Sequence, residues 1–470
     1  MTEAGLAQTI ARGGAHMMVR QILGMLIALG GMFALTGMIG PAAYGVYAAA
    51  LGIYAYAFAL SQWGIGVYLI RIRGEAAEDD YHQALTLLLL IGIVAVAAAV
   101  AASPQIERWT RLEGTRNVML ALFALLPLNL VALVANARLE RRLDYPRIAW
   151  IELAAQLSFY AVALPLAWRG AGMWAPVAGW WSYQWCSAIL MFLAADYRPR
   201  LRWRVARIRP MLGYGLGYGA SVWVWQARNL VNPLIVARFA GAEAVGVVAL
   251  TIRIVEALSF IKRVAWRMSI AAMARLQDDP GRLAAAIAEG MRAQVIALAP
   301  ALLAFSAASP WLVELAFGRR WLPLVEIYPF IALSYLANAL FNMHASALHV
   351  VRGNWRVAVF NLVHIALFAG SAWLLVPRLG IIGYGLAEVV ALAAYPVIDR
   401  QARRAVGAIA YQPSLAWAAG FGLALFWPWL GGWAAAGPLA VLVWPRTWRT
   451  LAGYRPLLGG LPRTRRQPIA

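Results

Sequence analysis

Apolar stretches of about 20 residues recur along this chain, from residue 17 to residue 444. A stretch of that length, folded as an α-helix, crosses the hydrocarbon core of a bilayer. Hydrophobic residues make up 63% of the 470 residues and charged residues only 13%, whereas a soluble chain averages about 45–50% apolar and about 25% charged residues. Mean hydropathy is +0.66. Because the chain lacks the polar surface that water requires, we predict an all-α polytopic membrane protein.

The hydropathy pattern contains 14 apolar segments, of which the first twelve are long enough to span. The last has about 11 residues, short of the roughly 17 that a span needs, so the final two can form a re-entrant hairpin instead. The prediction is therefore 12–14 transmembrane helices. The predicted spans are residues 17–38, 44–69, 84–102, 118–135, 148–168, 173–194, 211–239, 245–273, 291–317, 322–350, 357–376, 381–398, 415–430 and 434–444.

The basic residues predict the orientation in the membrane. The chain has 41 Lys and Arg against 20 Asp and Glu, for a formal net charge of +21. On the side that holds the N-terminus, the loops and tail carry 28 of them, the opposite loops carry 8, and five lie inside spans. By the positive-inside rule both termini are cytoplasmic. Since these cations are spread over short loops rather than one folded face, we expect no nucleic-acid binding.

The loops between spans leave little room for enzyme chemistry, because none exceeds about 20 residues. The single cysteine, Cys186, excludes intramolecular disulfides and Cys-based metal sites. Walker, Rossmann and HExxH patterns are absent. Two acidic pairs lie in short, Arg-flanked loops and are interpreted as turns or helix starts: Asp79-Asp80 and Asp278-Asp279. We therefore expect no cofactor, no metal and no catalytic residue.

Two turns of the same form indicate an internal repeat. Residues 40–45 read Gly-Pro-Ala-Ala-Tyr-Gly and residues 241–246 read Gly-Ala-Glu-Ala-Val-Gly, at an offset of 201. Glycine permits a tight turn and a close approach of the next helix. Six predicted spans separate the two copies, so both have the same orientation. This pattern predicts parallel repeats about an axis along the membrane normal, with a site between two lobes.

Four stretches carry a resemblance to a known family: residues 39–47 (Ile-Gly-Pro-Ala-Ala-Tyr-Gly-Val-Tyr), 274–280 (Ala-Arg-Leu-Gln-Asp-Asp-Pro), 317–322 (Phe-Gly-Arg-Arg-Trp-Leu) and 378–385 (Arg-Leu-Gly-Ile-Ile-Gly-Tyr-Gly). In this order and spacing the chain resembles the oligosaccharide and polysaccharide flippases, whose superfamily includes multidrug extruders and murein-precursor flippases. The resemblance implies two six-helix lobes around a central cavity and a lipid-diphosphate-linked sugar as cargo. Two positions depart from the family: Gly37 stands where an arginine is frequent, and Gln62 where an acid is frequent.

One face of span 211–239 carries polar side chains that fall within an arc of about 80° at 100° per residue. A charge at bilayer depth costs at least a few kcal/mol, so this face lines either a cavity or a hydrogen-bonded helix contact. Rings stack on sugars, and guanidinium binds phosphate through two hydrogen bonds, which favours a binding surface. The members are Tyr214, Tyr218, Ser221, Trp225, Arg228 and Asn232.

Span 245–273 carries a second polar face, again within about 80°. Arg253 and Glu256 are three residues apart and close enough to pair on a helix. The net cationic face suits a diphosphate, while a structural pair and snorkelling of the two later arginines to the headgroups are the alternatives. The members are Arg253, Glu256, Arg263 and Arg267.

Two further spans add candidates. Asn338 and Asn342 share one face of span 322–350 and suit either sugar hydroxyls or interhelical hydrogen bonds. Glu388 lies near the middle of span 381–398. Glu256 and Glu388 are the best candidates to bind a coupling proton or Na⁺, because carboxylates inside membranes mark ion pathways. For Glu388 a structural partner is the alternative.

Together these features predict a flippase that moves an undecaprenyl-diphosphate-linked oligosaccharide from the cytoplasmic to the periplasmic leaflet of a bacterial inner membrane by alternating access. The predicted domains are an N-terminal lobe (1–200), a C-terminal lobe (201–405) and an extra helix pair with a basic tail (406–470). Besides the lipid-linked substrate, the expected partners are membrane lipids, the coupling ion and a polymerase or glycosyltransferases, and the chain is expected to be monomeric. The predicted substrate-binding residues are Tyr218, Trp225, Arg228, Asn232, Arg253, Arg263, Arg267, Asn338 and Asn342.

Two alternatives remain from the sequence. A cation-coupled multidrug extruder on the same scaffold would have an acidic cavity. A membrane polysaccharide polymerase or ligase would need a sizeable periplasmic loop with reactive residues, which the short loops do not provide.

Overall fold

The structure is a computed structural model that describes residues 3–72, 74, 76–260, 273, 275–351 and 353–458, and these form helices and no strands. By length and hydropathy, eight helices of the described residues are able to cross a membrane, and a pair bent by 62°, Ser414–Ala424 with Trp427–Val443, would add a ninth. The predicted all-α polytopic membrane fold is confirmed. The eight are Ile27–Ser61, Glu78–Thr110, Thr115–Arg141, Tyr145–Trp168, Val222–Leu258, Pro280–Phe317, Pro323–Val350 and Trp355–Val406.

Three long helices contain a sharp turn at a glycine, and each turn lies between two predicted spans. Helix α1 (Glu3–Ser61) turns at Gly40, α9 (Ala237–Leu258) at Gly241 and α13 (Asn354–Ala391) at Gly380. Their φ angles are 75°, 83° and 57°, in the left-handed region that glycine adopts at no steric cost. The backbone is non-helical at each of these glycines, so two helices meet there, at the boundary between two predicted spans.

The chain forms two compact units. Unit 1 comprises Met1–Ala257, Pro310–Tyr328 and Asn354–Ala394, and unit 2 comprises Leu258–Ser309, Pro329–Gly353 and Tyr395–Ala470. Besides α1, α9 and α13, unit 1 contains α2 (Ile65–Arg71), α3 (Glu78–Thr110), α4 (Thr115–Phe123), α5 (Leu126–Arg141), α6 (Tyr145–Trp168), α7 (Trp174–Ala194) and α8 (Val205–Ala227).

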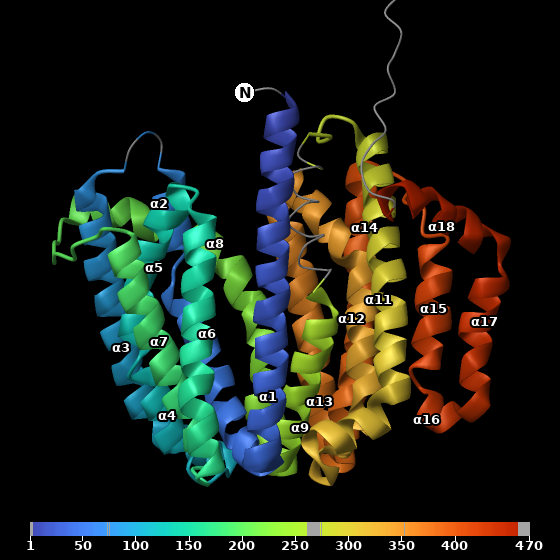
Figure 1. Cartoon of the computed structure of the whole chain (residues 1–470), viewed down its shortest axis with the longest axis horizontal. Coiled ribbons are helices and arrows are strands. Elements are labelled where there is room, and N and C mark those ends of the chain that lie inside the picture. The colour runs from blue at the N-terminus through green and yellow to red at the C-terminus, as the bar shows by residue number, and fades with distance from the viewer. Residues whose placement is uncertain are drawn as a thin grey trace, which may run out of the picture. The chain divides into compact units, whose positions relative to one another are not determined.

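Within unit 1, α6 packs along α7 and α3 along α4 and α5, as Figure 1 shows for the blue-to-green part of the chain. Alanines at these contacts, such as Ala163 and Ala175, are fully buried and let the helices approach closely. Close approach through small residues is the usual way in which helices associate in lipid, where apolar side chains gain little from leaving the solvent.

The two glycine turns of the predicted repeat lie against each other in unit 1. A Cβ atom added to Gly45 would lie 1.8 Å from the carbonyl oxygen of Ala242, and one added to Gly246 would lie 2.2 Å from that of Pro41. Residues 45 and 246, like 41 and 242, are 201 positions apart, so each contact is the counterpart of the other. Such reciprocity is what a two-fold relation between two copies of one motif produces.

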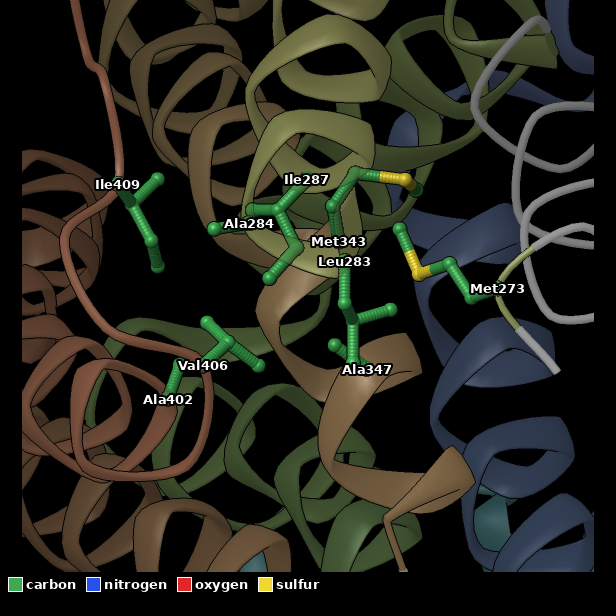
Figure 2. Packing of buried hydrophobic residues seen from close by; sticks show 9 residues of the cluster. All are labelled: Met273, Leu283, Ala284, Ile287, Met343, Ala347, Ala402, Val406 and Ile409. Carbon is green, nitrogen blue, oxygen red and sulfur yellow. The ribbon is translucent and has the colours of Figure 1, made fainter. Parts of the chain in front are cut away.

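Unit 2 contains residues 280–309 of α11 (Pro280–Phe317), residues 329–350 of α12 (Pro323–Val350), α14 (Tyr395–Val406), α15 (Ser414–Ala424), α16 (Trp427–Leu430), α17 (Ala436–Val443) and α18 (Pro445–Leu458). Apolar side chains from α11, α12 and α14 meet in its core, shown in Figure 2. The members are Met273, Leu283, Ala284, Ile287, Met343, Ala347, Ala402, Val406 and Ile409.

Candidate functional site

A buried ion pair inside unit 1 joins the ends of two helices. Nη2 of Arg228 lies 2.7 Å from Oε1 and 2.6 Å from Oε2 of Glu388. The Glu388 side chain is 1% exposed and that of Arg228 17%. These two residues are 160 positions apart, and the sequence had suggested separate roles for them, in substrate binding and in ion coupling.

The backbone around Arg228 departs from α-helical geometry. After α8 the chain forms one turn of 3₁₀-helix (Arg228–Leu230) and then a π-helix (Asn232–Val236). Pro233 has no amide hydrogen to donate, so the regular α-helical hydrogen bonds cannot continue through it. Single turns of π-helix occur frequently at functional sites. Arg228 therefore lies where the sequence interrupts the helix.

Aromatic side chains surround the ion pair. The Arg228 guanidinium carbon lies 5.9 Å from the ring centre of Trp225 and 5.5 Å from that of Phe368, within the range of cation–π attraction. The Tyr384 hydroxyl donates to Oε1 of Glu388 over 3.4 Å. The His364 ring lies 6.5 Å from that of Trp225. Aromatic rings therefore form a large part of the surroundings of the two charges.

Burial of the two charges makes the loss of either partner unfavourable for stability. Breaking a buried ion pair by removing one partner costs about 3–5 kcal/mol, because the remaining charge is left without compensation. An ionised side chain inside a membrane is tolerated only where it faces protein or a hydrated cavity. Arg228 and Glu388 are therefore expected to depend on each other, since either charge alone would lack this compensation.

A cleft of about 370 Å³ lies beside this site in unit 1 and is lined almost entirely by apolar and aromatic side chains. Ala227, the residue before Arg228, forms part of its wall. The lining residues are Tyr56, Leu60, Trp223, Val224, Ala227, Leu362 and Ile365.

A second, more exposed ion pair lies on α9. Nη1 of Arg253 is 3.5 Å from Oε2 of Glu256, and the two side chains are 56% and 39% exposed. The predicted pairing three residues apart is therefore present. Three phenols from α1 and α6 lie within electrostatic range of Arg253: Tyr44, Tyr47 and Tyr160. Tyr44 and Tyr47 are buried, and the Tyr160 hydroxyl donates to the carbonyl oxygen of Ala28.

The other predicted site residues are not members of these two ion pairs, and some of them lie outside the part of the chain that the structure describes. Asn232 is buried, and its amide donates to the carbonyl oxygen of Val245 over 3.3 Å. In unit 2, Asn342 donates to Oε1 of Gln294 over 3.2 Å, and Asn338 lies half-buried on the same helix. Tyr218 belongs to α8, but its side chain is not described. Arg263 and Arg267 lie outside the described residues.

Comparison with known proteins places the chain in a family. A family model described as "Polysaccharide biosynthesis protein" matches residues 34–326, which is more than half of the 470 residues. The chain belongs to this family. The predicted resemblance to oligosaccharide and polysaccharide flippases is thereby confirmed.

A curated relative supports the same assignment. The chain is 24% identical over 326 residues to the lipopolysaccharide biosynthesis protein WzxC of Escherichia coli (strain K12). The match covers 67% of this chain and 65% of that protein, slightly less than two thirds of the relative's length.

Solved structures share the fold of this polysaccharide biosynthesis family member. The lipid II flippase MurJ, in an inward closed conformation, superimposes with a TM-score of 0.69 at 11% identity, over 93% of this chain and 100% of that chain. An inward-facing multidrug resistance MATE family transporter of the MOP superfamily gives a TM-score of 0.63 at 12% identity, over 83% and 98%. At such identities the likeness shows the fold alone.

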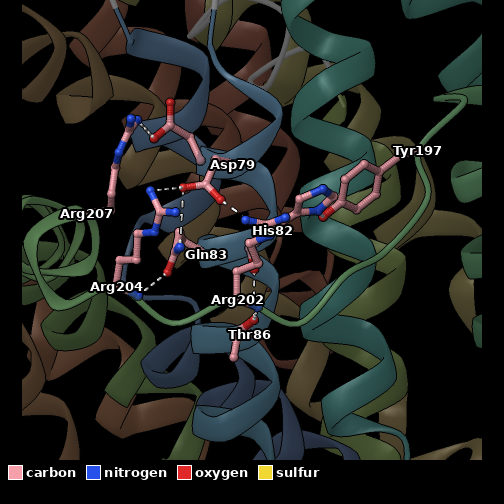
Figure 3. Close-up of polar contacts among 9 residues, drawn as sticks. Asp79, His82, Gln83, Thr86, Tyr197, Arg202, Arg204 and Arg207 are labelled. Carbon is pink, nitrogen blue, oxygen red and sulfur yellow. Dashed lines mark hydrogen bonds and ion pairs between the residues drawn. The ribbon is translucent and has the colours of Figure 1, made fainter.

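The acidic pair at the start of α3 holds the basic segment that connects α7 to α8 (Figure 3). Nη1 of Arg207 lies 2.7 Å from Oδ1 of Asp80, and this hydrogen bond raises the pKa of Arg207. Asp79 lies 3.8 Å from Arg202 and 3.9 Å from Arg204. Carboxylates in the first turn also interact favourably with the helix dipole. In this polysaccharide biosynthesis protein, Asp79 thus holds the segment between α7 and α8 against α3, and Asp80 holds the first turn of α8.

Three residues that surround the ion pair of Arg228 and Glu388 were not predicted from the sequence: His364, Phe368 and Tyr384. Tyr384 is four residues before Glu388, and this helical spacing is the one local signal that relates them. For His364 and Phe368 no local pattern points to Arg228, because they reach it from another helix.

Proposed function

We propose that this membrane protein is a flippase that moves an undecaprenyl-diphosphate-linked oligosaccharide from the cytoplasmic to the periplasmic leaflet of a bacterial inner membrane, for surface polysaccharide biosynthesis. One observation carries the proposal. The Arg228 guanidinium, enclosed by rings in a membrane-embedded unit, is held by the carboxylate of Glu388 over 2.6 and 2.7 Å.

The geometry of this pair suits an exchange of anions. A guanidinium binds carboxylate and phosphate in the same planar manner, through parallel N–H donors. A diphosphate carries more charge than one carboxylate, so it competes for Arg228 once it reaches the site. In this proposal Glu388 keeps Arg228 neutralised in the empty carrier, and the diphosphate headgroup takes its place on loading.

The same exchange provides ion coupling. When Glu388 binds a proton or Na⁺, its attraction for Arg228 falls, and the guanidinium becomes available to phosphate. Loading of the ion on Glu388 and of diphosphate on Arg228 would then favour each other, which is positive linkage between two ligands. Glu256, whose side chain is 39% exposed, remains a second candidate for the ion.

The surroundings of Arg228 suit the other parts of the substrate. Trp225 is 37% exposed, which leaves part of its face for a sugar ring. The apolar cleft that begins at Ala227 suits the first prenyl units of the lipid, while the remainder of the tail stays in the bilayer. Arg253, with its three tyrosines, is proposed as a further phosphate or sugar contact.

Transport would follow by alternating access of two lobes, 1–200 and 201–405. The contact of the two glycine turns joins the proposed lobes, and opening to the other side of the membrane would separate it. Both termini are proposed to face the cytoplasm, given the distribution of arginines. The proposed carrier acts as a monomer beside glycosyltransferases and a polymerase.

A bacterial strain that lacks this gene provides the test. Complementation with the wild type should restore surface polysaccharide, and Arg228→Ala should leave lipid-linked oligosaccharide trapped in the inner leaflet. Arg378→Ala is the matched control, because Arg378 is exposed on α13 and donates to the carbonyl oxygen of Leu374 within its own helix. Because Arg228→Ala also leaves Glu388 unpaired, membrane abundance is measured in parallel, together with Arg228→Ala/Glu388→Gln. Normal polysaccharide from an Arg228 variant of normal abundance would remove this residue from the site.

A further inference from the structure

Unit 2 contains a chain of four ionisable side chains that the proposed transport cycle does not use. His344 of α12 is fully buried, with Nε2 2.6 Å from the hydroxyl oxygen of Tyr411. That hydroxyl donates to Oδ1 of Asp399 on α14 over 2.6 Å. Nε of Arg403, one turn further along α14, donates to both carboxylate oxygens over 2.8 and 3.0 Å. This series of hydrogen bonds runs from the buried His344 to the exposed Arg403.

The hydrogen bond from Tyr411 to Asp399 indicates which nitrogen of the neutral His344 ring carries the proton. Since the hydrogen of Tyr411 goes to Asp399, the Tyr411 oxygen accepts from His344, and Nε2 carries the ring proton. A neutral imidazole has one N–H, so a second proton would make His344 a buried cation.

The surroundings do not compensate such a cation. The charged groups that face His344 among the described residues are Asp399 and Arg403, and these already neutralise each other over a short distance. The contribution of α11 to this core is apolar. Phe341 stacks on Tyr395 at 4.6 Å between ring centres and contacts the His344 and Tyr411 rings. Two cations for one carboxylate inside a buried cluster are unfavourable.

Tyr411 is the one member that belongs to no long helix. It lies in the segment 407–413, between α14 and α15, and its ring also receives the Arg403 guanidinium at 5.2 Å. Ile409 of the same segment is buried in the core beside Ala402 and Val406 (Figure 2). The four-residue chain therefore fastens this segment, and with it the start of α15, to α12 and α14.

We infer that His344 is a proton-binding site, whose neutral form holds segment 407–413 against α12 and α14 and whose protonated form releases it. Because the ring is fully buried, a proton reaches it only as the segment moves. Binding of the proton to His344 and release of segment 407–413 are therefore one linked event. The inference stands independently of the substrate of the carrier.

The test follows the mobility of the segment as a function of pH. A nitroxide is attached to a cysteine at Ala410, which is exposed, in the full chain with Cys186→Ser, in lipid bilayers. The spectrum is recorded between about pH 8 and about pH 5, which spans the ordinary titration of histidine. The label should become more mobile on acidification in the wild type, and this response should be absent in His344→Phe.

Two further variants separate proton binding from a purely structural role. His349→Gln, on the same helix, should keep the full response. Arg403→Gln removes the cation that competes with a protonated His344 for Asp399. The carboxylate can then compensate the protonated ring while the segment stays in place, so the acid response should be much smaller than in the wild type; a purely structural Arg403 would loosen the segment equally at every pH.

Three results would overturn the inference: a wild-type spectrum that is constant with pH, an acid response that survives in His344→Phe, or a loosening by Arg403→Gln that does not depend on pH. If His344→Phe does not fold, the size of the acid response in Arg403→Gln decides alone, and a response as large as that of the wild type would overturn the inference.

Discussion

The contact between the two glycine turns predicts a large effect from adding a single methyl group. In Gly45→Ala the new Cβ would lie 1.8 Å from the carbonyl oxygen of Ala242 and 2.9 Å from the amide nitrogen of Gly246. Real Cβ atoms essentially never approach closer than 3.0 Å, so the two backbones must separate by roughly 1.2 Å, and overpacking of this kind typically costs about 1–3 kcal/mol.

Gly30→Ala is the matched control, because Gly30 lies in the same helix α1 with nothing within 4 Å of an added Cβ. In an exposed helix interior alanine is favoured over glycine by about 1 kcal/mol. Thermal unfolding of the purified protein in detergent, followed by tryptophan fluorescence, should therefore give a lower midpoint for Gly45→Ala and an equal or higher midpoint for Gly30→Ala.

The reciprocal position sharpens this test. Gly246→Ala, with its Cβ 2.2 Å from the carbonyl oxygen of Pro41, should destabilise to a similar extent. The double variant should cost less than the sum, because the separation forced by one methyl group makes room for the other, and neighbouring sites are not additive. Equal midpoints for Gly45→Ala and Gly30→Ala would refute the close backbone contact.

Three further predictions concern the ion pairs. Arg228→Ala should lower the unfolding free energy by about 3–5 kcal/mol, because Glu388 loses its ion pair, and Arg228→Ala/Glu388→Gln should recover most of it; equal losses in both, measured by denaturant unfolding, would argue against the buried pair. Glu388→Gln should keep substrate binding, in tighter form, but remove the dependence of transport on an ion gradient, measured in proteoliposomes with and without that gradient, and an unchanged dependence would exclude Glu388 from coupling. Asp80→Asn should cost no more than about 1 kcal/mol, because the Arg207 side chain is 47% exposed and exposed ion pairs contribute little, and a several-fold larger loss would show that this contact between α3 and α8 is more important than its exposure indicates.

Local sequence signals predicted those parts of the fold that depend on neighbours in the chain. The turns at Gly40 and Gly241 could be predicted from the spacing of glycines in the sequence. The signal is local because each turn needs a positive φ, which residues other than glycine rarely adopt. The pair of Arg253 and Glu256 followed from helical geometry, which places residues three apart on one face. The division into domains 1–200, 201–405 and 406–470 stays a prediction.

The candidate site could be predicted only in part. The polar face that contains Arg228 was visible in the sequence, but its partner Glu388 was not, because pairing across 160 residues depends on how α8 and α13 pack. The calculation of that face also assumed 100° per residue, and the 3₁₀ and π turns from Arg228 to Val236 change this angle. A regular helix therefore described Trp225 correctly but not the direction of Asn232, which is buried against Val245.

Binding of undecaprenyl diphosphate to the purified protein tests the proposed exchange at Arg228 most directly. If Glu388 competes with phosphate, Glu388→Gln should bind this lipid at least about tenfold more tightly than the wild type, a difference of about 1.4 kcal/mol, and Arg228→Gln/Glu388→Gln should lose the gain. Equal affinity of the wild type, Glu388→Gln and the double variant would contradict the account.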